Sequence, residues 1–196
     1  MDSPTDHYEA ADLVTKRLGL PSNFVFDLLD DDDWSFIIKS HALMEAAAVE
    51  AIKHRLSDHT IDKFLKRLQM GKCLDFAQEL QAIDDQLLKK IRLISKIRND
   101  IIHDVTKYAF SLTEYLSNTD KRNEYQGVFL REISGSVKID GHNIECKQLL
   151  IENPKLPVIF FLIELLVEVY LQEPKAMLKS VQQRLGESIL KLCRKT

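Results

Sequence analysis

The feature that most constrains the fold is a periodic stretch from residue 87 to residue 107, LLKKIRLISKIRNDIIHDVTK. Its apolar positions recur in steps of four and three, which is the spacing of one face of an α-helix: Leu87, Ile91, Ile94, Ile101 and Val105. The position where this row should continue holds Arg98. The sequence therefore predicts a helix that packs one side into a core and carries a charged group within that side.

A second row along the same helix is basic or able to hydrogen-bond at every position: Lys89, Arg92, Lys96, Asn99, His103 and Lys107. A metal-free ribonuclease needs a group to take the 2′-hydroxyl proton, a cation for the phosphorane charge and a group to orient one of them. His103 is the candidate for proton transfer, Arg98 for bidentate phosphate contact and Asn99 for orientation. The charges of Asp100 and Asp104 would oppose an incoming phosphate.

The spacing of Arg98 and His103 sets a geometric condition. On a straight helix the two side chains point about 140° apart. They share one site only if the guanidinium wraps round, if the helix ends or bends near Asn99, or if a second subunit supplies one of them. A dimer is therefore one form of the hypothesis.

A second long helix is expected to open in the acidic run 27–33 and to end at Leu56. Its predicted inward row is Ile38, Ala42, Glu45, Val49, Ile52 and Leu56. Because a lone buried charge is costly, we expect the two long helices to pack together and Glu45 to meet Arg98, directly or through water. That pair either supports the site or only fixes the register of the two helices. His41, four residues before Glu45, could form a local hydrogen bond with it.

The sequence predicts helices for the rest of the chain, apart from one loop and one β-hairpin. We expect helices at 8–18, 60–69, 72–83, about 155–171 and 175–195, and a loop at 117–123. Alternating residues around Asp140-Gly141 predict a small β-hairpin at about 134–146. The prediction is a single all-α domain over residues 1–196, a helical bundle with its core at about 32–116 and the hairpin inserted before the C-terminal helices of about 155–195.

Composition excludes several classes of protein. The net charge is −3, so any nucleic-acid site must be local. The odd number of cysteines without a CxxC pair, the absence of a signal peptide and an apolar run too short to span a bilayer predict a cytoplasmic protein without membrane association. No Gly-rich phosphate loop, HExxH or GxSxG is present, and His54 and His59 are poorly spaced for a shared metal, so we expect no cofactor and no metal. The acidic run fits helix capping and solubility, since a cation site would need further ligands.

The segment Arg98-Asn99-Asp100-Ile101-Ile102-His103 resembles the signature of the HEPN superfamily, an arginine followed after four to six residues by a histidine, with Asn after the Arg. The wider stretch 34–115 resembles the mannitol operon repressor-like branch, through FIIKSHALMEAAAVEAI, GKCLDFAQELQAI, LISKIRNDIIHD and YAFSLTEY. The resemblance implies a HEPN-like helical bundle, a homodimer with the motif helices near the twofold axis, and Arg98 and His103 as a ribonuclease pair. Asn99 would be the adjacent polar residue and Glu45 a supporting residue on the preceding long helix.

Two function hypotheses follow. The first is a metal-independent endoribonuclease, a toxin or defence effector, that leaves a 2′,3′-cyclic phosphate. Its RNA backbone would be guided by Lys89, Arg92, Lys96 and Lys107. The alternative is a non-catalytic transcriptional regulator or interaction module that works as a dimer with an antitoxin, a regulatory protein or an operator. Under it, Arg98 and Glu45 are a structural pair and His103 is incidental.

Overall fold

The computed structural model describes residues 12, 14–56, 61–65, 67–102, 109–139 and 142–171. Several predicted features lie outside these residues. They are His59, His103, Asp104, Val105, Lys107, the Asp140-Gly141 turn, the start of the helix at 8–18 and the whole of the helix at 175–195.

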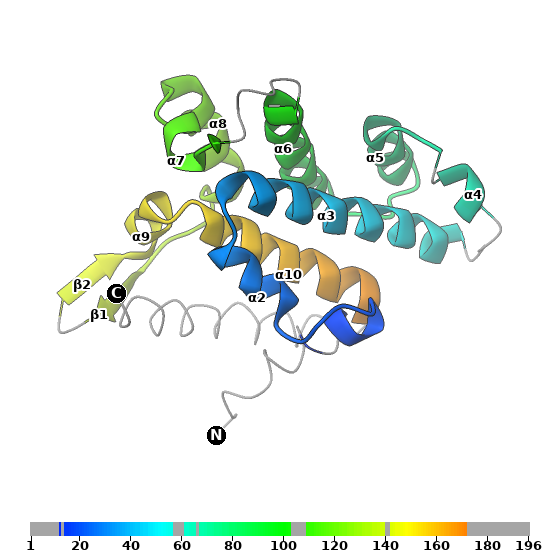
Figure 1. Ribbon diagram of the computed structural model, residues 1–196, viewed down its shortest axis with the longest axis horizontal. Coiled ribbons are helices and arrows are strands. Elements are labelled where there is room, and N and C mark those ends of the chain that lie inside the picture. Colours follow the sequence, from blue (N-terminus) through cyan, green and yellow to red (C-terminus); the bar gives the residue numbers. More distant parts are fainter. Residues whose placement is uncertain are drawn as a thin grey trace.

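Three long helices carry the fold: α3 (Asp33–Leu56), α6 (Asp85–Ile102) and α10 (Lys155–Leu171). The shorter elements are α2 (Phe24–Asp27), the 3-10 helix η1 (Leu28–Asp30), α4 (Asp62–Leu65), α5 (Met70–Glu79), α7 (Leu112–Tyr115), α8 (Thr119–Phe129), β1 (Ser136–Ile139), β2 (His142–Glu145) and α9 (Cys146–Glu152). Figure 1 shows α5 and α6 above α3, with α2 and α10 below it. The predicted all-α bundle and the packing of α3 on α6 are confirmed.

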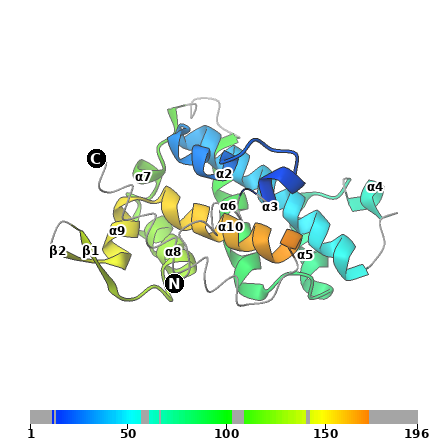
Figure 2. The same ribbon diagram turned by 90° about the horizontal axis from the view of Figure 1, so that it is seen from below.

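The predicted hairpin is also present. Strands β1 and β2 pair antiparallel, with Ser136 opposite Glu145 and Val137 opposite Ile144. Figure 2 places this hairpin and α9 at one end of the molecule and α4 at the other. The hairpin therefore lies far from α5 and from the side of α6 that α5 contacts.

Helix α10 is buried nearly all round, because it is apolar on every face. Its bounds agree with the predicted 155–171. Pro157 sits in its first turn, where a missing N–H costs no intrahelical hydrogen bond. The carboxylate of Glu164 interrupts the apolar surface and meets Lys90 Nζ on α6 at 3.3 Å. No helix in the described ranges has the length and apolarity that a membrane crossing requires.

The predicted loop at 117–123 is wrong, because α8 begins at Thr119. The side chain of Asn118 caps this helix by accepting hydrogen bonds from the N–H groups of Asp120 (3.1 Å) and Lys121 (3.2 Å). One helical spacing apart, Tyr125 and Phe129 bury their rings in the core. In the sequence alone, a polar first turn with a strong cap resembles a loop. Helix α9 was not predicted, and α4 is much shorter than the helix expected at 60–69.

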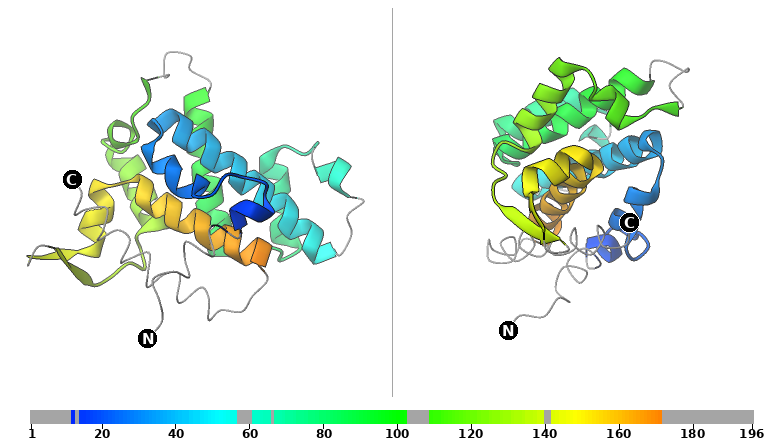
Figure 3. Two further views of the ribbon diagram at one scale, coloured as in Figure 1. Left: turned by 60° about the horizontal axis from the view of Figure 1, so that its bottom comes forward. Right: turned by 90° about the vertical axis from the view of Figure 1, so that its left-hand side faces the viewer.

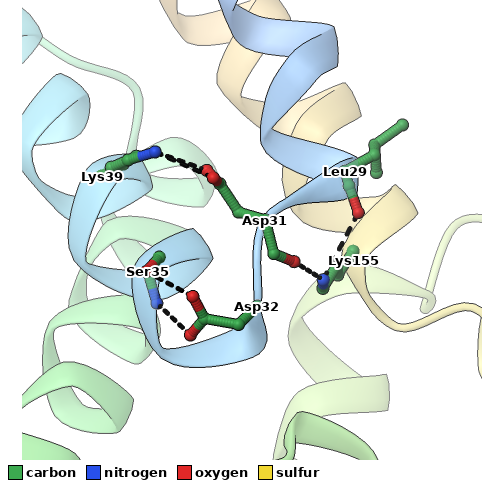
Figure 4. A network of polar contacts seen from close by, with 6 residues as sticks. All are labelled: Leu29, Asp31, Asp32, Ser35, Lys39 and Lys155. Atoms are coloured by element: carbon green, nitrogen blue, oxygen red, sulfur yellow. Dashed lines mark hydrogen bonds and ion pairs between the residues drawn. The ribbon is translucent and has the colours of Figure 1, made fainter.

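The acidic run caps α3 and ties down its start, as the capping interpretation predicts. Asp32 accepts hydrogen bonds from the Ser35 N–H (2.9 Å) and from the Ser35 hydroxyl (2.5 Å) (Figure 4). Asp31 pairs with Lys39 at 2.8 Å. These carboxylates are therefore occupied by neighbouring protein groups.

Candidate functional site

Arg98 lies in the last two turns of α6 and is half-buried. Its Nη1 donates a hydrogen bond to Oδ1 of the exposed Asn99 at 3.1 Å. Within the described residues no carboxylate forms an ion pair with Arg98. Since a guanidinium has five N–H donors, most of them stay available to an anion from solution.

The predicted inward row of α3 is wrong at Ala42, Glu45 and Leu56, which are exposed, whereas its Ile52 is buried and its Ile38 and Val49 are partly buried. The helix also buries Ile37, His41, Met44 and Ala48, which the row did not include. The alanine-rich sequence fits more than one face, and the actual face is set by α10 and α6, which both pack on α3. The exposed Glu45 forms no direct ion pair with Arg98, although the two helices do pack together.

His41 is the residue that sequence reasoning undervalued. It is only 7% exposed, and its charged neighbours are Glu45, one turn further along α3, and Arg98 on α6. Burial lowers the pKa of His41, the positive charge of Arg98 lowers it further, and the carboxylate of Glu45 opposes both. The imidazole is therefore neutral at pH 7. Ile37, His41 and Met44 recur at helical spacing on the face that α3 buries. This spacing is the sequence pattern that indicates a buried histidine at position 41.

Cys73 on α5 extends this group of residues. The thiol is buried, and burial, followed by the charge of Glu45, raises its pKa to about 11. Such a thiol stays protonated and is a poor nucleophile. The charge of Glu45 acts on both His41 and Cys73, and α5 packs on both α3 and α6.

The predicted RNA-binding row on α6 is partly engaged within the protein. Arg92 pairs with Asp75 of α5 at 2.8 Å and also donates to Gln78 at 3.1 Å. Lys96 pairs with Glu124 of α8 at 2.6 Å, and this hydrogen bond raises its pKa. Both pairs are exposed, so they are weak and can exchange with other anions. Lys89 is exposed.

Asp100, which was expected to repel a phosphate, is held on the side of α7 and α8. The Tyr115 hydroxyl donates to Asp100 Oδ2 at 2.7 Å, and Lys121 Nζ lies 3.6 Å from the same oxygen. Lys121 also lies 3.6 Å from the centre of the Tyr115 ring. These contacts offset part of the negative charge beside Arg98.

A second place in the described residues has a hollow but no polar lining. A small hollow between residues 14, 25 and the second half of α10 is lined only by apolar side chains, namely Val14, Val25, Ile163, Leu166 and Val167. In the ranges that the structure describes, no three His, Cys, Asp or Glu residues are arranged to hold a metal ion.

No family model, curated protein or solved structure matches this chain. The end of α6 around Arg98, with His41 and Glu45 of α3 beside it, is thus the candidate site on the basis of its own residues.

Proposed function

We propose that this chain is a metal-independent endoribonuclease of the HEPN type, with its reaction centre built around Arg98, Asn99 and His103. The observation that carries this proposal is the half-buried guanidinium of Arg98, which has no carboxylate partner in the described part of the chain. A guanidinium that bonds to Asn99 and forms no ion pair with a carboxylate of the described residues is suited to a planar, bidentate contact with phosphate. The segment 98–103 resembles the HEPN signature, and this resemblance supports the same conclusion.

The proposed reaction is transesterification of the RNA backbone. His103 takes the proton of the 2′-hydroxyl, the 2′-oxygen attacks the adjacent phosphorus, and the bond from phosphorus to the 5′-oxygen breaks. The leaving 5′-oxygen receives a proton from the protonated His103 or from water, so the products are a 2′,3′-cyclic phosphate and a 5′-hydroxyl. Arg98 stabilises the charge that develops on the phosphorane oxygens, and Asn99 orients the guanidinium. A homodimer with the ends of α6 close together is part of this proposal.

The experiment is a cleavage assay with purified protein, a structured RNA and EDTA. We expect cleavage by the wild type, loss of cleavage in His103→Ala and Arg98→Ala, and a 2′,3′-cyclic phosphate on the product by mass spectrometry. His54→Ala, which removes a half-buried histidine paired with Glu50 at 3.2 Å outside the site, is the matched control and should cleave normally. Equal cleavage by His103→Ala and the wild type would overturn the proposal.

The second candidate is a dimeric, non-catalytic regulator or interaction module. It is favoured by the ion pairs of Arg92 and Lys96, which join α6 to α5 and α8 and so give part of the basic row a structural role. Under this function no RNA is cleaved, and expression of the wild type and of His103→Ala has the same effect on growth. Growth arrest by the wild type alone favours the ribonuclease.

A further inference from the structure

Three exposed cations without a carboxylate partner in the described residues lie on one segment outside the basic row of α6. Lys63 on α4, Arg67 after it and Lys72 on α5 are exposed, and none of them pairs with a carboxylate within the described residues. They lie within ten residues of one another in the sequence. Arg92 and Lys96, by contrast, are both engaged with carboxylates.

An aromatic ring lies among these cations. Phe64 is 55% exposed, the highest exposure of any large hydrophobic side chain in the described ranges. The neighbouring Leu65 is 1% exposed and anchors α4 to the core, so Phe64 is turned outward by the same short helix. The backbone N–H of Arg67 donates to the Phe64 carbonyl oxygen at 3.0 Å, so the two residues lie on one turn of the chain. Nothing in the core requires an aromatic residue at this position.

The segment lies next to the candidate site. Helices α5 and α6 are consecutive and antiparallel, because Asp75 pairs with Arg92 and Gln78 bonds to Asp85 at 3.3 Å. The first turn of α5, with Lys72, therefore lies beside the last turns of α6, with Arg98. Cys73 follows Lys72, and the charge of Glu45 affects its pKa. The charges of Glu45 and Arg98 both affect the pKa of His41. Figures 1 and 3 show α4 and α5 at one end of the molecule, with α5 next to α6.

We propose that Lys63, Phe64, Arg67 and Lys72 form a binding surface for single-stranded RNA, which leads the strand toward Arg98. This inference rests on the proposed ribonuclease function. An exposed ring stacks on an unpaired base of any sequence, while cations on either side contact the phosphates. A duplex cannot offer an unstacked base, so this surface selects a single strand. In a chain of net charge −3, such a local surface is also how an RNA is captured.

The test separates binding from cleavage by using a fluorescein-labelled, single-stranded 2′-O-methyl oligoribonucleotide, which lacks the nucleophilic hydroxyl. Fluorescence anisotropy is measured at several salt concentrations. The double variant Lys63→Glu/Arg67→Glu should weaken binding more than about tenfold and reduce the slope of log K against log salt by about 1.4. Phe64→Ala should weaken binding by about 5- to 100-fold, and Phe64→Tyr, which keeps a stacking ring, should restore it.

The matched control is Arg131→Glu/Lys147→Glu, which makes the same change in net charge at exposed positions after α8 and on α9, near the hairpin end. It should bind within about threefold of the wild type, since long-range charge effects are screened. Circular dichroism confirms that each variant is folded.

The outcomes distinguish the two proposals. If the surface variants bind like the control, or if a duplex binds as tightly as the single strand, the surface is overturned even when His103→Ala abolishes cleavage. If the surface variants lose binding but the wild type cleaves no unmodified RNA, the surface stands and the ribonuclease proposal fails.

Discussion

Asp33 Oδ1 lies 2.9 Å from Lys155 Nζ, so the first residue of α3 is joined to the first residue of α10. The other carboxylate oxygen of Asp33 accepts a hydrogen bond from the Leu112 N–H at 2.6 Å, at the start of α7. Lys155 also donates to the carbonyl oxygens of Asp31 (2.5 Å) and Leu29 (3.4 Å), as Figure 4 shows. One carboxylate and one ammonium group thus connect segments that are far apart in the sequence.

Replacing Asp33 should therefore be costly for stability. We expect Asp33→Ala to lower the free energy of unfolding by about 1.5–3 kcal/mol, because two charge-assisted hydrogen bonds are lost and the Leu112 N–H is left without a partner. Urea denaturation measures the change. Asp31→Ala is the control, since it removes only the exposed pair with Lys39 and should cost less than about 1 kcal/mol. Equal effects of the two substitutions would contradict the role of Asp33.

Arg98→Ala should affect activity far more than stability. Arg98 is half-buried, and its removal leaves no carboxylate unpaired in the described residues. We expect the free energy of unfolding to fall by less than about 1 kcal/mol and RNA cleavage to fall by at least about 100-fold. Denaturation and cleavage are measured on the same preparation. A loss of several kcal/mol, as expected for breaking a buried ion pair, would instead favour a structural role.

His41 should make the protein less stable in acid. Its pKa in the folded state is lowered by burial and by Arg98, against the opposing charge of Glu45, so the unfolded chain binds a proton at a pH where the folded protein does not. The part of the free energy of unfolding that depends on neutral His41 is fully present above 6.5, the pKa of His41 in the unfolded chain. It is lost as the pH falls toward the lower pKa of His41 in the folded protein. We expect the wild type to lose more stability between pH 7 and pH 5 than His41→Gln does. Parallel curves for the two proteins would contradict this expectation.

The cysteines should differ in reactivity. Cys73 is 2% exposed with a pKa raised to about 11, whereas Cys146 on α9 is partly exposed. In a Cys193→Ser background, a thiol reagent at pH 8 should modify Cys146 and leave Cys73 unmodified until the protein is unfolded. Mass spectrometry of peptides from the native and urea-unfolded protein measures both sites. Rapid native modification of Cys73 would show that α5 opens readily.

Helix positions could be predicted where the local pattern has one solution. The stripe from Leu87 to Ile101 and the apolar run from Val158 to Tyr170 are both buried, and the bounds of α10 agree with prediction. At Asn118 a capping asparagine followed by polar residues resembles a loop in the sequence, whereas the burial of Tyr125 and Phe129 in the structure shows that a helix begins there.

The candidate site was predicted only in part. The mixture of apolar and polar residues marked α6 and Arg98, but it could not show that Arg92 and Lys96 have carboxylate partners on other helices. His41 was noted only for its spacing to Glu45. The exposed cations around Phe64 carry no sequence motif, and only the tertiary structure shows that they lack carboxylate partners among the described residues.

The sequence by itself determined the all-α class, the hairpin, the helical register of α6 and the bounds of α10, because these depend on periodicity, apolar runs and turn residues within one segment. Only the tertiary structure decided which face of α3 is buried. Its alanines and small polar residues allow several faces, and the choice came from α10 and α6 packing on it. With that face buried, Glu45 is exposed and His41 is buried near Arg98. The burial of a residue and the charges near it depend on contacts between segments that are distant in the sequence, and no local pattern encodes these contacts.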